Sequence, residues 1–163
     1  MKTVIIVRHA KSSWADIAMA DFDRPLNDRG KKDAQEMAAK LKKKGISIDF
    51  FISSPAKRAK KTAQLFAGEF EYPKEKILFL PQLYHAGVSD FIEVIYKLPD
   101  TVNTIILFSH NPGITEFVNC LTDTKIDNMP TCAAYAVTLN CNNWVDFEQA
   151  KKKFSFLEYP KAV

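Results

Sequence analysis

Thr3-Val4-Ile5-Ile6-Val7-Arg8-His9 decides the fold of this chain, because an uninterrupted apolar run ends directly in a cation and an imidazole. A second run, Thr104-Ile105-Ile106-Leu107-Phe108, is followed by Ser109-His110-Asn111-Pro112. Runs without polar alternation are typical of strands that are covered on both faces, as in parallel sheets. Ligands of open α/β sheets bind beyond the carboxyl ends of the strands, where we expect both histidines to lie.

Helix-like and strand-like patterns alternate along the rest of the chain. After a polar loop over 10–28, apolar residues at 34, 37, 38 and 41 predict a helix that Asn27 or Asp28 caps and Gly45 ends. Ser54-Pro55 and Asn111-Pro112 each predict a helix start, with a cap followed by proline at the first helical position. Further strands are expected at 49–53, 77–80, 131–139 and 154–159, and a further helix at 89–98. This order predicts an α/β fold with a mostly parallel sheet, helices on both faces and an antiparallel edge strand.

Composition sets the broad class of the protein. The chain has 163 residues, of which 47% are hydrophobic, enough for one core of ordinary size, so we expect a single domain over 1–163. The first apolar run is too short for a signal peptide or a membrane span, and no membrane association is expected. Cys120, Cys132 and Cys141 lack the Cys-x-x-Cys spacing of a zinc site, which favours a cytoplasmic protein with free thiols.

Lysine-rich clusters account for the modest net charge of +4. They occur at 40–44, 57–61 and 151–153, in or near helical patterns, and are interpreted as solvated faces. Aromatic residues do not alternate with them and no nucleic-acid motif is present, so nucleic-acid binding is not expected.

Arg8, His9, Arg58 and His110 are the residues predicted to meet at the carboxyl edge of the sheet. Arg58 falls in the opening turn of the helix after Ser54, where unpaired backbone N–H groups add partial positive charge. A site of this kind selects a compact anion with several oxygens, and the fork of arginine fits a phosphoryl group. A neutral imidazole among these cations can attack phosphorus and form a phosphohistidine intermediate that water then cleaves.

A metal site is the competing interpretation, because histidine is the commonest metal ligand. Arg8 and Arg58 place fixed positive charge beside any such cation, and no suitably placed carboxylate compensates for it. The residues therefore favour phosphate over a metal ion.

Three motifs resemble those of the histidine phosphatase superfamily, whose signature is Arg-His-Gly/Ala after the first strand, an arginine after a Ser-Ser/Thr-Pro-like turn, and a late second histidine. Here they are Arg8-His9-Ala10, Ser53-Ser54-Pro55 with Arg58, and Ser109-His110-Asn111. The longer stretches 8–14 and 21–30 resemble the small bacterial phosphohistidine phosphatases, which act on phosphorylated signalling proteins.

This resemblance implies a phosphoglycerate mutase-like α/β/α sandwich with no metal or organic cofactor. It implies His9 as nucleophile, Arg8 and Arg58 as phosphate ligands, and His110 as a further ligand of the phosphoryl group. The implied substrate is a phosphohistidine on a protein, and inorganic phosphate is the product.

Two positions depart from the phosphoglycerate mutase branch and count against mutase activity. His85 stands where that branch has its carboxylate general acid, and Ala15 stands in place of a phosphate-contacting asparagine. Histidine titrates near neutral pH, so His85 is a candidate proton donor, as are Asp23 and Glu116 with weaker support. A phosphoramidate depends less on a strong acid than a phosphate ester does, because its departing nitrogen can itself be protonated.

The leading hypothesis is thus a cytoplasmic phosphohistidine phosphatase that works through His9. A general phosphatase for small phosphoesters or nucleotides is the alternative within the same chemistry. A phosphate- or phosphoprotein-binding module without turnover is the alternative outside it. Short connections leave no segment for a capping subdomain, so the site is expected to admit a phosphorylated side chain on a protein.

Overall fold

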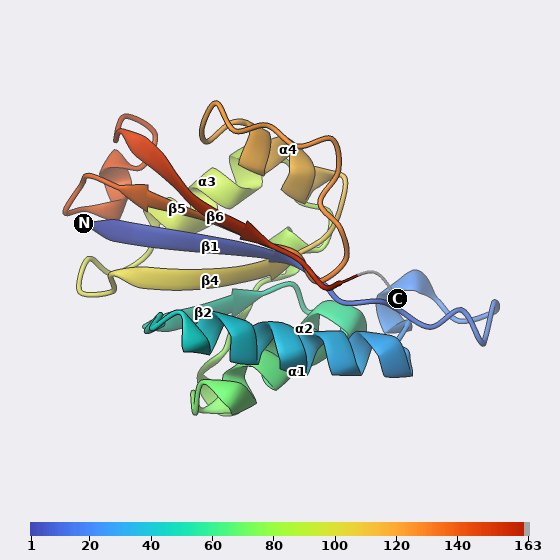
Figure 1. The fold of residues 1–163 in the computed structure, drawn as a ribbon. Helices are drawn as coiled ribbons and strands as arrows, with labels where there is room; N and C mark the ends of the chain where they lie inside the picture. Colours follow the sequence, from blue (N-terminus) through green and yellow to red (C-terminus); the bar gives the residue numbers. More distant parts are fainter. Residues whose placement is uncertain (162–163) are drawn as a thin grey trace.

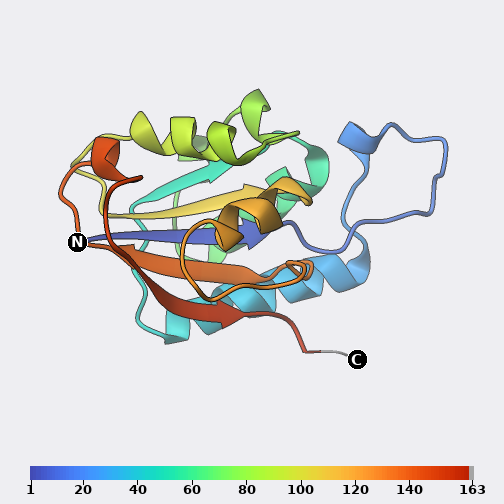
Figure 2. The same cartoon turned by 90° about the horizontal axis from the view of Figure 1, so that it is seen from above.

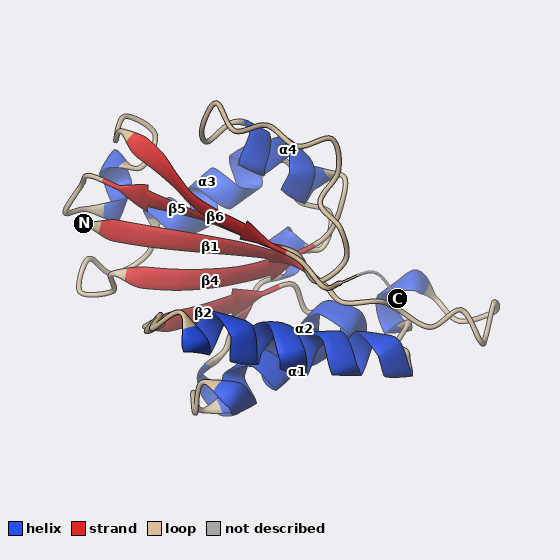
Figure 3. Cartoon of the chain, in the orientation of Figure 1, coloured by secondary structure: helices blue, strands red, loops and turns tan. Residues whose placement is uncertain are grey.

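The apolar run at the amino terminus forms a central strand of a six-stranded sheet in the computed structural model, which describes residues 1–161. β1 (Lys2–Arg8) pairs in parallel with β4 (Thr104–Ser109) and antiparallel with β5 (Ala134–Leu139). The strand order is β3-β2-β4-β1-β5-β6, with β2 (Phe50–Ser53), β3 (Leu78–Phe79) and β6 (Lys152–Glu158) as the remaining strands. β3, β2, β4 and β1 are parallel, and β5 and β6 add the antiparallel edge (Figure 3). The predicted mixed sheet is confirmed.

Helices cover both faces of this sheet (Figures 1 and 2). α1 (Asp28–Lys43) and α2 (Lys57–Glu69) pack on one face, and α3 (Val88–Tyr96) and α4 (Gly113–Asn119) pack on the other. Along β1, Ile5 and Val7 enter the first of these cores while Val4 and Ile6 enter the second, and all four are fully buried. Both faces of β1 are apolar because each has a helical layer to pack against. The three-layer α/β/α sandwich is confirmed.

Two of the predicted helix starts are wrong. The Asn27 side chain does cap α1, since its Oδ1 accepts from the Gly30 N–H at 2.7 Å. α2, however, begins at Lys57, because the backbone is still extended at Ala56, whose ψ is 139°. The Ser54 hydroxyl accepts from the Ala56 N–H and contacts His110. α4 likewise begins at Gly113 rather than at Pro112.

The strand boundaries also differ from those expected. β3 contains only two residues, and β5 begins at Ala134 rather than at 131, after Cys132, whose φ of 62° interrupts an extended run. The turn at 140–143 leads into a short 3-10 helix, η4 (Trp144–Asp146), whose buried Trp144 joins the core of the α3 and α4 face. Three further 3-10 helices are η1 (Asp21–Asp23), η2 (Lys74–Lys76) and η3 (Pro81–Leu83).

Gly30 lets the loop after β1 cross the first turn of α1. A Cβ at this position would lie 2.1 Å from the Lys11 carbonyl oxygen, so only glycine permits the approach. The loop is further fixed by a bridge between Ser12 and Leu26. As a result, residues 10–27 form an arm that reaches beyond the carboxyl end of the sheet (Figure 1).

Within residues 1–161, no helix combines the length and the apolar character needed to cross a bilayer.

Candidate active site

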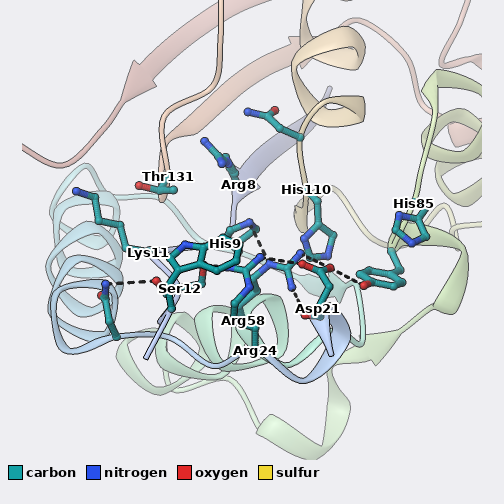
Figure 4. A pocket seen from close by; sticks show the side chains of 14 residues that line it. Arg8, His9, Lys11, Ser12, Asp21, Arg24, Arg58, His85, His110 and Thr131 are labelled. Carbon is teal, nitrogen blue, oxygen red and sulfur yellow. Dashed lines mark hydrogen bonds and ion pairs between the residues drawn. The ribbon is translucent and has the colours of Figure 1, made fainter. Parts of the chain in front are cut away.

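A cavity of about 580 Å³ lies at the carboxyl ends of β1 and β4 (Figure 4). It contains all four residues that the sequence predicted to meet, Arg8, His9, Arg58 and His110. The arm after β1, the residues that follow η3 and the segment before β5 complete its walls. The other lining residues are Lys11, Ser12, Trp14, Asp21, Arg24, Asn27, Tyr84, His85, Asn111 and Thr131.

His9 lies just beyond the end of β1 and is buried. Its Nδ1 lies 2.7 Å from the Ala10 carbonyl oxygen, which only accepts, so Nδ1 carries the proton and Nε2 holds a free electron pair. Arg58 Nε donates to this Nε2 at 3.4 Å. Burial lowers the pKa of His9 to about 3, and the positive charge of Arg58 and Arg8 acts in the same direction. The imidazole is therefore neutral, with its nucleophilic nitrogen facing a guanidinium group.

Both predicted arginines direct donors into the site. Arg58, the second residue of α2, is buried and donates from Nη1 to the Asp21 carbonyl oxygen at 2.7 Å and from Nη2 to the Asp21 carboxylate at 3.0 Å. Arg8 donates from Nη1 to the Met129 carbonyl oxygen at 2.9 Å, while its buried Nε has no partner within the described chain. Burial and the nearby Arg58 charge lower the pKa of Arg8. An anion that entered here would relieve the repulsion between these two cations.

His110 follows β4 and faces His9, with ring centroids 5.1 Å apart. Its Nε2 lies 2.8 Å from the Ser54 hydroxyl, which already accepts from the Ala56 N–H. A hydroxyl group can donate one hydrogen bond and accept two, so this contact fits either neutral tautomer of His110. Its Nδ1 is buried and has no partner within residues 1–161. Burial lowers the pKa of His110 to about 2, and the charges of His9 and Arg58 contribute to the shift. This second imidazole is also neutral.

Asp21, Arg24 and Tyr84 belong to the site although sequence reasoning assigned them no role. The Asp21 carboxylate accepts from Tyr84 Oη at 2.5 Å, from Arg24 Nη2 at 2.8 Å and from Arg58 Nη2 at 3.0 Å. These donors hold the pKa of Asp21 well below its usual range. Asp21 therefore compensates the charges of Arg24 and Arg58, and the expectation that no carboxylate is placed to do so is wrong.

The three candidates for a general acid line different hollows of the surface. His85 lines the cavity, is exposed, and packs its ring against Tyr84 with centroids 4.0 Å apart. Glu116 lines a smaller adjoining cavity of about 200 Å³ together with His85 and His110. Asp23 faces a separate groove. Among the three, only His85 borders the main cavity.

The donor set of the cavity suits an anion better than a metal ion. Within residues 1–161, no cluster of three or more histidine, cysteine, aspartate or glutamate side chains is arranged to hold a metal. The imidazole nitrogen of His9 that a metal would need faces Arg58, and the Asp21 carboxylate is engaged by three donors.

A family model described as histidine phosphatase superfamily (branch 1) matches residues 4–83, a range that includes Arg8, His9 and Arg58. An uncharacterized chloroplastic protein of Arabidopsis thaliana is 30% identical over 152 residues, which are 88% of this chain and 69% of the relative. The chain belongs to the histidine phosphatase superfamily.

Solved structures of superfamily members share the whole fold. SixA from Agrobacterium tumefaciens, a candidate phosphohistidine phosphatase, matches with a TM-score of 0.82 at 21% identity, over 98% of this chain and 99% of that one. A protein histidine phosphatase SixA in complex with tungstate matches with a TM-score of 0.81 at 25% identity, over 96% of each chain. The expected phosphoglycerate mutase-like fold is thereby confirmed.

The superfamily motifs explain which site residues could be found from the sequence. Arg8, His9, Arg58 and His110 belong to the motifs, whereas Asp21 and Arg24 lie only within the longer matching stretch 21–30. Within the histidine phosphatase fold of this chain, η1 turns the Asp21 carboxylate and the Arg24 guanidinium back toward Arg58. The sequence did contain a signal for these two residues. It is a carboxylate and an arginine three residues apart, in the loop that follows the first motif.

Proposed function

We propose that this protein is a metal-independent phosphatase that transfers the phosphoryl group of its substrate to His9 and then hydrolyses the phosphohistidine. The observation that carries the proposal is the neutral, buried His9 imidazole, whose free Nε2 lies beside Arg58 and close to Arg8. An imidazole with its lone pair directed into a cationic cavity is suited to attack phosphorus.

The proposed reaction has two displacements at phosphorus. His9 Nε2 forms the first new bond, the bond from phosphorus to the leaving group breaks, and the leaving group takes the electron pair and a proton. Water then attacks the phosphorus atom of the phosphohistidine. The bond from phosphorus to Nε2 breaks, its electron pair returns to Nε2, the attacking water gives a proton to solvent, and inorganic phosphate leaves. Throughout, the Ala10 carbonyl oxygen accepts from Nδ1–H and stabilises the positive charge that the ring carries when it is phosphorylated.

Arg8, Arg58 and His110 are proposed to bind the phosphoryl oxygens. Guanidinium groups match the geometry of these oxygens, and loss of one such donor costs about 10²–10³ in rate. Nη1 and Nη2 of Arg58 each contact Asp21 once, so each has a second N–H group that can bind a phosphoryl oxygen. The similarity to the tungstate-bound SixA supports a site for a tetrahedral oxyanion.

The favoured substrate is a phosphohistidine on a protein that takes part in signalling. Asp21 is the carboxylate of the cavity, and a pKa held so low leaves it without a proton to donate. A leaving nitrogen suits such a site better than a leaving alkoxide, because it can be protonated from solvent. Exposed residues such as Lys11 and Trp14 form the rim of the cavity, which suits a side chain presented by another protein. The three cysteines are free thiols, which supports the proposal of a cytoplasmic location.

Trapping with a labelled phosphoryl donor, followed by mass spectrometry, tests the mechanism. The label is expected on His9, and His9→Ala is expected to abolish both labelling and turnover without loss of the fold. Full activity in that variant would reject His9 as the nucleophile.

A substrate panel tests the specificity. We expect a phosphohistidine peptide to be hydrolysed with a higher kcat/KM than small phosphoesters or nucleotides. The opposite ranking would favour a general phosphatase, and binding of phosphate without any turnover would favour a non-catalytic module.

A further inference from the structure

A second groove, of about 590 Å³, lies beside the proposed active site. One wall is the outer stripe of α2, with Lys57, Lys60 and Lys61, and the first turns of α1 contribute Lys31. Phe22 and other residues of the arm after β1 form the opposite side. We refer to it below as the lysine groove.

The lysine groove and the proposed active site share η1 as a common wall. Asp21, at the start of this 3-10 helix, lines the active-site cavity, while Phe22 and Asp23 line the groove. On α2, Lys57 lines the groove and the next residue, Arg58, lines the cavity. The two hollows are therefore neighbours on the surface, on either side of η1.

The charge in the groove is positive, because its lining contains four lysines and one carboxylate. All four lysines are exposed, and none forms an ion pair with a carboxylate in the part of the chain that the structure describes. Asp23 is the one carboxylate among the lining residues. This surface therefore attracts a negatively charged partner.

The positions of these lysines are unfavourable for the stability of α2. The first turn of α2 contains no acidic residue, although the positive end of a helix dipole favours acidic side chains and disfavours lysine. Lys57 and Lys61 are also four residues apart on one helix face, a spacing at which like charges repel. The helix dipole and the repulsion between like charges therefore both disfavour this stripe, whereas an acidic ligand would offset both effects.

The groove is also partly apolar, which defines the chemistry of that ligand. Phe22 is 40% exposed, and Pro25 and Pro55 line the same hollow. Lysine side chains add apolar stems beneath their charged ends. A segment of protein with acidic and apolar side chains matches this surface, whereas a bare phosphate ion would leave the apolar part unused.

We propose that the lysine groove docks an acidic, amphipathic segment of the phosphorylated protein while its phosphohistidine enters the cavity. This rests on the proposed function, because it adds a protein-binding site to the phosphatase centre. The lysines act on the affinity for the protein and leave the phosphoryl transfer to the residues of the cavity.

Kinetics on three probes test the proposal. The probes are phosphoramidate, a phosphohistidine peptide flanked by glutamate and leucine, and the same peptide with glutamine in place of glutamate. The groove variant is Lys31→Ala/Lys60→Ala/Lys61→Ala, which leaves Lys57 beside Arg58 unchanged. The control variant is Lys43→Ala/Lys74→Ala/Lys76→Ala, which removes the same charge from exposed lysines outside the groove.

The groove variant is expected to lose about tenfold in kcat/KM for the acidic peptide, through KM, and the loss should diminish at high salt. Its activity on phosphoramidate and on the glutamine peptide should stay within twofold of the native value, as should all activities of the control. Equal losses in the two variants would overturn the proposal, as would an equal loss on phosphoramidate.

Fluorescence anisotropy with the labelled, unphosphorylated glutamate peptide separates docking from turnover. If the native protein hydrolyses none of the probes, the proposed function fails, but weaker peptide binding by the groove variant than by the control still supports docking. Identical peptide binding by both variants overturns it. Loss of binding to a labelled oligouridylate with unchanged peptide binding would assign the groove to nucleic acid and also overturn it.

Discussion

Arg58→Lys keeps the positive charge of the site but removes the planar fork that organises it. In the native protein the guanidinium donates in two directions, from Nε to His9 Nε2 and from both Nη atoms to Asp21. A lysine ammonium is a compact charge at the end of a flexible chain and cannot hold both directions at once. The variant therefore tests the geometry of the guanidinium group while the positive charge at position 58 is kept.

We expect kcat/KM for phosphoramidate to fall by about 10²–10³, the usual effect of losing one donor to the transition state. The free energy of unfolding should fall by about 1–3 kcal/mol, because the Arg58 side chain is only 7% exposed and its loss removes hydrogen bonds to His9 and Asp21. Phosphate release measures the first quantity and urea unfolding measures the second.

Arg29→Lys provides the matched control. Arg29 also donates from Nε to a carboxylate of its own helix, Asp33, at 2.8 Å, but it does not line the cavity. Its replacement should leave kcat/KM within twofold of the native value. If Arg58→Lys retains activity within threefold of the native enzyme, then charge alone suffices and the proposed role of the fork is wrong.

Other perturbations test the packing, the protonation and the proton donor. Gly30→Ala should destabilise the fold by about 2 kcal/mol, because the new Cβ would lie 2.1 Å from a backbone oxygen, whereas Gly68→Ala meets no atom within 4 Å and should stabilise α2 by about 0.5 kcal/mol in urea unfolding. Burial lowers the pKa of His9 to about 3 and that of His110 to about 2, whereas both have the ordinary value of 6.5 in the unfolded chain. As the pH falls below 6.5, the unfolded chain therefore binds protons at these residues before the folded protein does. Unfolding free energy should consequently decrease from pH 6.5 toward pH 3, with a shallower slope in His9→Gln, and an unchanged slope would contradict the assigned burial. His85→Gln should reduce phosphoester hydrolysis about 10²-fold while phosphoramidate hydrolysis stays within threefold, and equal losses on both would rule out proton donation by this residue.

The sheet and the four central residues were predictable because they depend on local patterns. The apolar runs before Arg8 and His110 lack polar alternation, so they specify buried strands, and the strand ends then place both residues at one edge. Arg58 followed from its position after a strand and at the start of a helix. Short-range rules therefore determined both the fold class and the core of the site.

The contacts around Asp21 were not predictable, because they join distant parts of the chain. Tyr84 and Asp21 are 63 positions apart in the sequence, and no periodic pattern predicts that Tyr84 Oη donates to the Asp21 carboxylate. The predicted start of α2 was wrong because the backbone is still extended at Ala56, although the Ser54 hydroxyl accepts from the Ala56 N–H as a capping side chain would. The same hydroxyl contacts His110, 56 positions away, and the local pattern does not predict that contact either.

The two tryptophans of this chain occupy opposite environments. Trp14 lies on the rim of the cavity, 69% exposed, with the Arg24 guanidinium 3.9 Å from its ring centre, whereas Trp144 is fully buried. Emission at long wavelength and quenching by acrylamide therefore report mainly on Trp14. Arg24 also contacts the Asp21 carboxylate. An oxyanion that displaces this carboxylate therefore changes the surroundings of the Trp14 indole. The fluorescence of Trp14 should then report whether an oxyanion occupies the site.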